Sequence, residues 1–181
     1  ELNRRFNNDA VTIKALDEVV SIGGRYKKWL IFAISIDHAE SIQQMLASMG
    51  VSAGVVHSKM TEDRDQVLDD FRDGTLMAVV NVNVLTTGID IPDIDLIVML
   101  RPTKSAIIYA QSVGRGLRVS PDKDHCLVLD FANNVSTHGA IDDISIINKG
   151  EKKDGEAPTK ECPKCQCINY AGAKSCMACG F

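Results

Sequence analysis

The sequence predicts an α/β domain in which helices cover both faces of a parallel sheet, followed by a small cysteine-rich appendage. Over residues 1–147, short apolar segments alternate with segments of helical periodicity, and this alternation favours parallel strands joined by helices. The apolar segments contain few polar residues, as expected of strands buried on both faces. Five of the six cysteines lie within residues 162–179. The stretch 148–160 is charged and contains glycine and proline, so we expect a linker there and assign 161–181 to the appendage.

Each element of the sheet domain follows from local signals. Asp37, with Glu40 three residues later, is expected to cap a helix that ends before Gly50. Thr61 is expected to cap the next helix, which ends before Gly74. The remaining expected elements are helices over about 9–20 and 104–118 and strands over 30–34, 52–57, 76–82, 95–100 and 125–131.

Composition limits the classes of function. A hydrophobic content of 45% is sufficient for a proper core, and the net charge of −4 argues against a generally basic nucleic-acid coat while leaving room for a local basic groove. No apolar run approaches the roughly 20 residues of a membrane span, and no signal peptide is visible. Clustered cysteines suggest a metal site in a reducing, cytoplasmic setting. The first residue is Glu1, so we expect the chain to be a piece of a longer protein.

The segment Tyr109 to Arg118, YAQSVGRGLR, is the strongest functional signal. On a helix, Gln111, Arg115 and Arg118 fall within about 60° of one another, so an amide and two guanidiniums share one face. The opposite, buried face is expected to hold Ala106, Ala110, Val113 and Leu117.

Two glycines flank the first of these arginines. Gly114 and Gly116 each cost about 1 kcal/mol of helix propensity relative to alanine. Close approach of a polyanion such as phosphate would explain them, because the guanidinium fork suits phosphate oxygens. The alternative is a surface helix with two solvated arginines.

A second signal is the loop NVLTTGIDIPDID that follows the strand 76–82. Ligands of open parallel sheets bind beyond the carboxyl ends of the strands. Gly88 permits close backbone approach, and Asp90 is placed to accept hydrogen bonds from a ribose hydroxyl. The alternative is a turn aspartate bonded to its own backbone.

The appendage carries a four-thiolate pattern. Cys162 and Cys165 are separated by two residues, as are Cys176 and Cys179, with ten residues between the pairs. This spacing predicts a zinc ribbon with a closed, structural Zn²⁺ site, and Cys167 is expected to be a free neighbour. A thioredoxin-like redox pair would need a βαβ setting that this segment lacks. Whether the ribbon grips nucleic acid or docks a protein stays open; its lysines are Lys160, Lys164 and Lys174.

Four segments, taken in order, resemble a known family. IFAISIDHAE, VVHSKMTEDRDQVLDDFRDG, VNVLTTGIDIPDID and YAQSVGRGLR are similar to motif IV, the region after it, motif V and motif VI of superfamily 2 helicases of the DEAD/DEAH type. The resemblance covers residues 28–140, and the tail LDFANNVSTHG resembles the XPB-related and phage-type branch. It implies that residues 1–147 form the second, C-terminal RecA-like domain of a two-domain motor.

The resemblance also implies roles at the nucleotide. Arg115 and Arg118 match the motif VI arginines that reach the nucleotide phosphates across the interdomain cleft, and Gln111 matches the residue that positions the terminal phosphate or attacking water. Gly88 and Asp90 match motif V, which touches the nucleotide. An arginine supplied from a second domain can contribute about 10³–10⁵ in rate to phosphoryl transfer.

At the implied nucleic-acid contacts, this chain departs from the family's usual residues. Many relatives carry Thr-Asp where this chain has Val82 and Asn83, so the phosphate contact is expected to fall to Thr86, Thr87 or a backbone amide. His57 and Lys59 are candidates for the nucleic-acid groove, although a histidine at a strand end is more often a satisfied structural residue. His138 matches a family position without an assigned role.

The chain lacks both a GxxxxGK[ST] phosphate loop and a DExD/H magnesium box. We therefore expect it alone neither to bind ATP tightly nor to hydrolyse it; ATP and Mg²⁺ would require an N-terminal RecA-like domain of the same protein. The implied track is nucleic acid, DNA more than RNA, in the cytoplasm, or the host cytoplasm if a phage encodes the protein. The alternatives are a non-catalytic nucleic-acid or protein-binding module and, less favoured because no GxGxxG follows a first strand, a Rossmann-type oxidoreductase.

Overall fold

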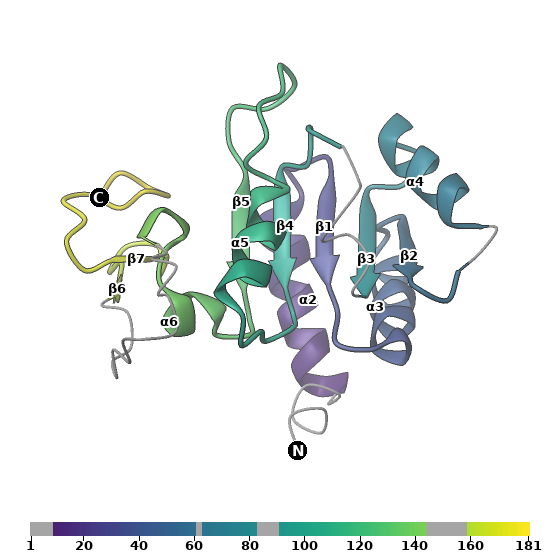
Figure 1. Ribbon diagram of the computed structural model, residues 1–181, viewed down its shortest axis with the longest axis horizontal. Helices are drawn as coiled ribbons and strands as arrows, with labels where there is room; N and C mark the ends of the chain where they lie inside the picture. The colour runs from purple at the N-terminus through teal and green to yellow at the C-terminus, as the bar shows by residue number, and fades with distance from the viewer. Residues whose placement is uncertain (1–8, 61–62, 83–90, 144–158) are drawn as a thin grey trace. The chain divides into compact units, whose positions relative to one another are not determined.

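The computed structural model describes residues 9–60, 63–82, 91–143 and 159–181. Within them a five-stranded parallel sheet has the order β2-β3-β1-β4-β5, and β6 and β7 form an antiparallel pair (Figure 1). The α/β prediction is thus confirmed. The helical elements are α2 (Asp9–Gly23), α3 (Ile36–Ser48), α4 (Asp63–Asp73), α5 (Ala106–Gly114), α6 (Asn134–His138) and the 3₁₀ turn η1 (Ile141–Asp143). The strands are β1 (Trp29–Phe32), β2 (Ala53–His57), β3 (Ala78–Val82), β4 (Leu96–Met99), β5 (Leu127–Asp130), β6 (Thr159–Glu161) and β7 (Ile168–Tyr170).

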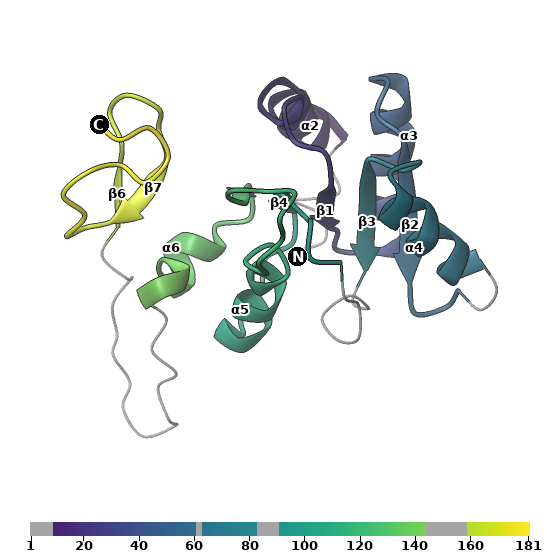
Figure 2. The same cartoon turned by 90° about the horizontal axis from the view of Figure 1, so that it is seen from above.

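One face of the parallel sheet is covered by α2 and α3, which lie on the same side of it (Figure 2). Trp29 and Ile31 of β1 point to this side, and Ile31 is in register with Val80 of β3 and Val98 of β4. Leu16 of α2 and others of this cluster are fully buried. The strands are apolar on both sides because helices cover both faces.

The opposite face receives α4. Leu68 and Phe71 of this helix are buried. A Cβ added to Gly54 of β2 would lie 2.6 Å from Cγ1 of Val67 and 2.8 Å from Cδ1 of Leu76. Glycine at this position therefore lets α4 approach the sheet closely.

The helix ends are partly as expected. Gly50 and Gly74 follow α3 and α4 with φ of +81° and +89°, which confirms the predicted stops. The N-cap of α3 is Ser35 and not Asp37, because the Ser35 side chain accepts a hydrogen bond from the His38 N–H at 3.2 Å. Asp37 instead lies in the first helical turn, where a carboxylate is also favourable. The predicted cap Thr61 lies outside the described residues.

The chain forms two compact units, and their boundary falls within α5. One unit comprises Glu1–Pro102 with Gln111–Ala132, and the other comprises Thr103–Ala110 with Asn133–Phe181. The expected linker 148–160 lies mostly outside the described residues, and the ribbon begins by Thr159. Among the described residues, no helix combines the length and the apolar character that crossing a bilayer requires.

His138 has a structural role in the second unit. Its Nε2 lies 2.7 Å from the Thr103 carbonyl oxygen, and its ring stacks on Tyr109 with centroids 5.6 Å apart. The side-chain oxygen of Asn134 accepts the Thr103 N–H at 2.8 Å. These contacts hold α6 against the start of α5. They give His138 a structural role, for which the sequence alone provides no signal.

Candidate functional site

The arginine turn, residues 115–118, follows directly after α5. The N–H of Arg115 bonds to the Ser112 carbonyl at 3.3 Å, and the N–H of Gly116 bonds to the Val113 carbonyl at 3.0 Å. These i→i−3 bonds tighten the last turn and end the helix at Gly114. The predicted helix to Arg118 is therefore wrong: Gln111 is exposed on α5, whereas Arg115 and Arg118 are half-buried in the turn beyond it.

The buried side of α5 also differs from the prediction. Val113 is buried as expected, but Leu117 is 55% exposed. Leu117 lies beyond the helix end, so helical periodicity no longer applies to it. Tyr109 and Ser112 are buried in α5 instead.

Close packing within the protein accounts for the glycine at position 116, so the approach of a polyanion is not needed to explain it. A Cβ at this position would lie 2.2 Å from Sγ of Cys126 and 2.9 Å from Cδ1 of Ile97. The turn thus approaches the starts of β4 and β5 more closely than any side chain allows. At Gly114, by contrast, an added Cβ would meet nothing within 4 Å.

This difference gives a matched pair of predictions. We expect Gly116→Ala to lower the free energy of unfolding by about 2–3 kcal/mol through overpacking. Combining it with Cys126→Ala should recover part of that loss. Gly114→Ala is expected to stabilise the protein by up to about 1 kcal/mol. Urea unfolding of the chain measures all three, and equal effects at both glycines would contradict the packing explanation.

The return segment, residues 91–95, lies next to this turn. Because β3 and β4 are parallel, the chain after Val82 has to come back to the edge where the strands begin. Ile91 and Ile94 of the return segment are both buried. Nζ of Lys123 donates to the Ile94 carbonyl at 2.6 Å and to the Gly116 carbonyl at 2.8 Å. One side chain therefore joins the return segment to the arginine turn.

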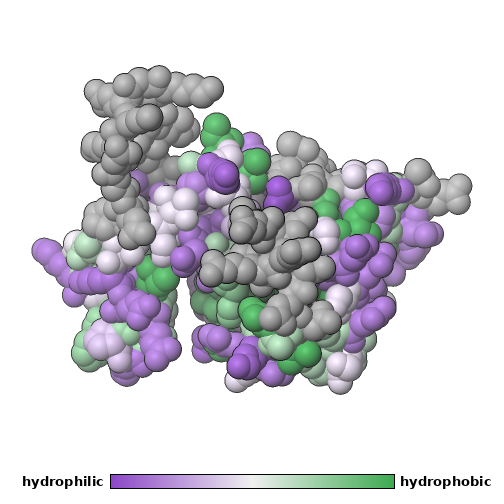
Figure 3. Space-filling model, turned by 90° about the horizontal axis from the view of Figure 1, so that it is seen from below, coloured by the Kyte–Doolittle hydropathy of each residue, from purple (hydrophilic) through white to green (hydrophobic). Residues whose placement is uncertain are grey.

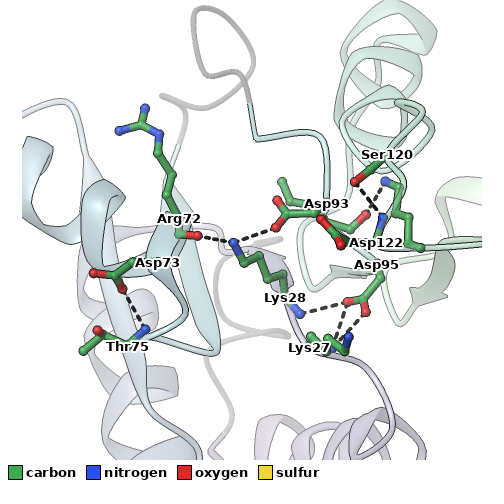
Figure 4. A network of polar contacts seen from close by, with 11 residues as sticks. Lys27, Lys28, Arg72, Asp73, Thr75, Asp93, Asp95, Ser120 and Asp122 are labelled. Carbon is green, nitrogen blue, oxygen red and sulfur yellow. Dashed lines mark hydrogen bonds and ion pairs between the residues drawn. The ribbon is translucent and has the colours of Figure 1, made fainter.

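A second lysine holds the return segment from the other side (Figure 4). Nζ of Lys28 lies 2.7 Å from Oδ2 of Asp93 and also donates to the Arg72 carbonyl at the end of α4. The Asp95 carboxylate accepts the backbone N–H groups of Lys27 and Lys28 at 2.9 and 2.8 Å. Sequence reasoning missed this network because its members are far apart in the chain. The pair of aspartates in IPDID was the only local signal.

The predicted site residues do not all lie at one edge of the sheet. Ligands were expected beyond the carboxyl ends of the strands, but Gly116 lies beside Cys126 and Ile94, which precede β5 and β4. The arginine turn is thus at the edge where the parallel strands begin. Four other predicted residues lie outside the described residues: Thr86, Thr87, Gly88 and Asp90.

His57 and Lys59 lie at the opposite edge, where β2 ends. Nδ1 of His57 accepts the Lys59 N–H at 3.2 Å, within a local turn, and Lys59 is exposed. This bond accounts for the histidine structurally, and its role toward nucleic acid stays a prediction. Seen from the side on which the parallel strands end, hydrophilic residues and small hydrophobic patches are interspersed over the described part of the surface (Figure 3).

The four predicted zinc ligands converge. Their sulfur atoms all lie within 4.8 Å of one another, with Cys162 3.6 Å from Cys179 and Cys165 3.5 Å from Cys176. Four thiolates around Zn²⁺ at about 2.3 Å would be about 3.8 Å apart, so the donor set fits a tetrahedral ion. These separations are far longer than the roughly 2.05 Å of a disulfide. Cys167 is not one of these four; its thiol contacts the Ile168 carbonyl at 3.7 Å, and burial and the neighbouring Cys176 raise its pKa.

Backbone amides and one buried side chain support the cluster. Burial opposes the Cys176 thiolate, but the N–H groups of Cys179 and Ala178 hold its pKa below the ordinary value, which suits a metal-binding thiolate. Nδ2 of Asn169 lies 3.6 Å from Sγ of Cys176, and its Oδ1 accepts the Met177 N–H at 3.0 Å. Asn169 thereby orients the second pair of cysteines.

The two cysteine pairs end in the same backbone conformation, with different residues. Gln166 follows Cys165 with φ of +60°, and Gly180 follows Cys179 with φ of +71°. A side chain is strained in this left-handed region. We expect Gln166→Gly to stabilise the ribbon by about 0.5–1 kcal/mol and to raise its thermal midpoint. Lys164→Gly is the control, because Lys164 does not have a positive φ, and it should not raise the thermal midpoint. A lower midpoint for Gln166→Gly would contradict this account.

Comparisons with known proteins show which family the chain is similar to. Residues 12–120 match the family described as the helicase conserved C-terminal domain, and this range includes both the loop after β3 and the arginine turn. The chain is 35% identical over 106 residues to the candidate ATP-dependent helicase IRC3 of Saccharomyces cerevisiae, covering 58% of this chain and 15% of IRC3. It is 28% identical over 162 residues to a 51.5 kDa protein of a Lactococcus phage, covering 85% of this chain and 36% of that protein.

A solved structure shares the fold. The structure of S. cerevisiae Dbp5 bound to RNA and ADP BeF3 matches with a TM-score of 0.59 and 23% identity, over 69% of this chain and 33% of Dbp5. The chain therefore spans well under half the length of these three proteins.

Proposed function

Because this chain belongs to the helicase conserved C-terminal domain family, we propose that it is the C-terminal motor half of an ATP-dependent nucleic-acid helicase or translocase. The family match over residues 12–120 is the observation that carries the proposal, since it covers the loop after β3, the return segment and the arginine turn together. The RecA-like fold supports it.

In this proposal the arginine turn acts on the nucleotide. Arg115 and Arg118 contact phosphates across a cleft, Gln111 positions the terminal phosphate or the attacking water, and Gly88 with Asp90 touches the nucleotide. The turn suits such a role because Gly116 and Lys123 fix its backbone, and phosphoryl transfer is catalysed mainly by positioning and charge stabilisation. An N-terminal RecA-like domain of the same protein supplies the phosphate loop and the Mg²⁺ ligands, which this chain lacks.

The track is nucleic acid, and we propose DNA in preference to RNA. The similarity to the XPB-related and phage-type branch favours DNA, whereas the Dbp5 structure contains RNA. Contacts are assigned to Thr86, Thr87, His57 and Lys59. Four converging thiolates support a structural Zn²⁺ in the ribbon. Because such cysteines have to stay reduced to bind the ion, we place the protein in a reducing compartment such as the cytoplasm.

ATP hydrolysis by the full-length protein tests the proposal. The rate is measured without nucleic acid, with single- and double-stranded DNA, and with RNA, beside this chain alone. We expect stimulated turnover in the full-length protein, strongest with DNA, and none above background in the chain alone. Turnover by the chain alone would refute the divided site. A full-length protein that binds nucleic acid without hydrolysing ATP would favour the non-catalytic module.

A further inference from the structure

Lys123 lies on the loop between α5 and β5, after the arginine turn. Its side chain is half-buried and reaches two backbone carbonyls that are far apart in the chain: Ile94 of the return segment, at 2.6 Å, and Gly116 of the arginine turn, at 2.8 Å. Its own N–H faces the Ser120 carbonyl at 3.5 Å, and the Ser120 hydroxyl accepts the Asp122 N–H at 3.3 Å. The loop is therefore folded so that the ammonium group points back between the two segments.

The ammonium group of Lys123 has fixed partners. Burial lowers the pKa of Lys123 and outweighs the carboxylates of Asp95 and Asp93, which oppose that change. Asp93 and Asp95 are themselves held by Lys28 and by backbone N–H groups, so the negative side of the network is fixed. Hydrogen bonds from a charged donor to carbonyls are stronger than neutral ones.

We propose that Lys123 is a positioning residue that sets the distance between the return segment and the arginine turn, and so places Arg115 for phosphoryl transfer. The Gly116 carbonyl is one residue from Arg115, and Ile94 follows the loop that contains Asp90 by only four residues. Without the ammonium, the Ile94 and Gly116 carbonyls both lose this hydrogen-bond donor. This inference rests on the proposed function of the arginine turn.

Steady-state ATP hydrolysis by the full-length protein tests the inference. We expect Lys123→Met to lower kcat about tenfold while the KM for ATP changes less than about twofold, because misplacement of a group that acts in the transition state affects kcat. Lys27→Met is the matched control, since Lys27 is exposed and only its backbone N–H takes part in the network; it should retain the wild-type kcat.

A double-mutant cycle separates positioning from general stability. In an Arg115→Ala background, Lys123→Met should cost less than about twofold in kcat, because its effect passes through Arg115. An equal loss in both backgrounds, or a Lys123→Met kcat within about twofold of the wild type, would overturn the inference.

Hydrogen exchange provides a readout that does not depend on turnover. Amides of residues 112–118 should exchange faster in Lys123→Met than in Lys27→Met, at unchanged global stability. If the wild-type protein hydrolyses no ATP, the proposed function fails, and this exchange difference alone decides whether Lys123 holds the turn. Identical exchange in the two variants would overturn that role.

Discussion

Replacing Arg115 by alanine in the full-length protein is expected to lower the nucleic-acid-stimulated kcat for ATP hydrolysis by about 10³-fold, the lower end of the range for an arginine supplied across a domain interface. The loss should appear mainly in kcat, since the guanidinium acts on charge that develops in the transition state. Arg115→Lys should recover little, because an ammonium lacks the planar fork that bonds two phosphate oxygens.

The control is an arginine of the same domain with a different environment. Arg72 on α4 pairs with Asp69 at an exposed site, and such pairs contribute little. Its carbonyl, which Lys28 uses, is kept in Arg72→Ala. That variant should retain wild-type kcat. A similar loss in both variants, or none in Arg115→Ala, would contradict the assignment of the arginine turn.

Replacing Cys162 by serine is expected to abolish zinc binding and unfold the ribbon. Structural zinc contributes an apparent free energy of about 10–16 kcal/mol to small domains of this kind, and the ribbon has few apolar residues to replace it; Tyr170 and Phe181 are its aromatics, and both are exposed. Metal analysis should find one zinc per wild-type chain and none in the variant, with loss of amide protection over 159–181.

Cys167→Ser provides the matched comparison. Cys167 lies next to Cys176 and its thiol contacts the Ile168 carbonyl, but it is not one of the four converging cysteines. We expect this variant to keep its zinc and its ribbon. If Cys167→Ser loses the metal while Cys162→Ser keeps it, the ligand set is wrong.

Much of the fold follows from the sequence because its signals are local. The strands are apolar runs with covered faces, and Gly50 and Gly74 end helices through backbone angles that glycine adopts freely. The errors lie at boundaries, where two signals compete. Ser35 and Asp37 are both good caps, and only the backbone at Ser35, in extended conformation, decides between them.

The geometry of the arginine turn was not predictable from the sequence, and the roles of its residues stay predictions. Helical periodicity placed Gln111, Arg115 and Arg118 on one face, but the helix ends at Gly114, and only tertiary packing against Cys126 shows why Gly116 is there. The bonds of Lys123 join segments 29 and 7 residues away, and no local pattern predicts such partners.

The most direct test of the central claim is the position of Arg115 relative to bound nucleotide. A structure of the full-length protein with nucleic acid and a non-hydrolysable ATP analogue gives the distance from the Arg115 guanidinium to the nearest γ-phosphate oxygen. Our account predicts a charge-assisted hydrogen bond of about 2.7–2.9 Å. A nucleotide bound with Arg115 pointing away from it, or bound entirely outside the cleft between the two RecA-like domains, would contradict the account.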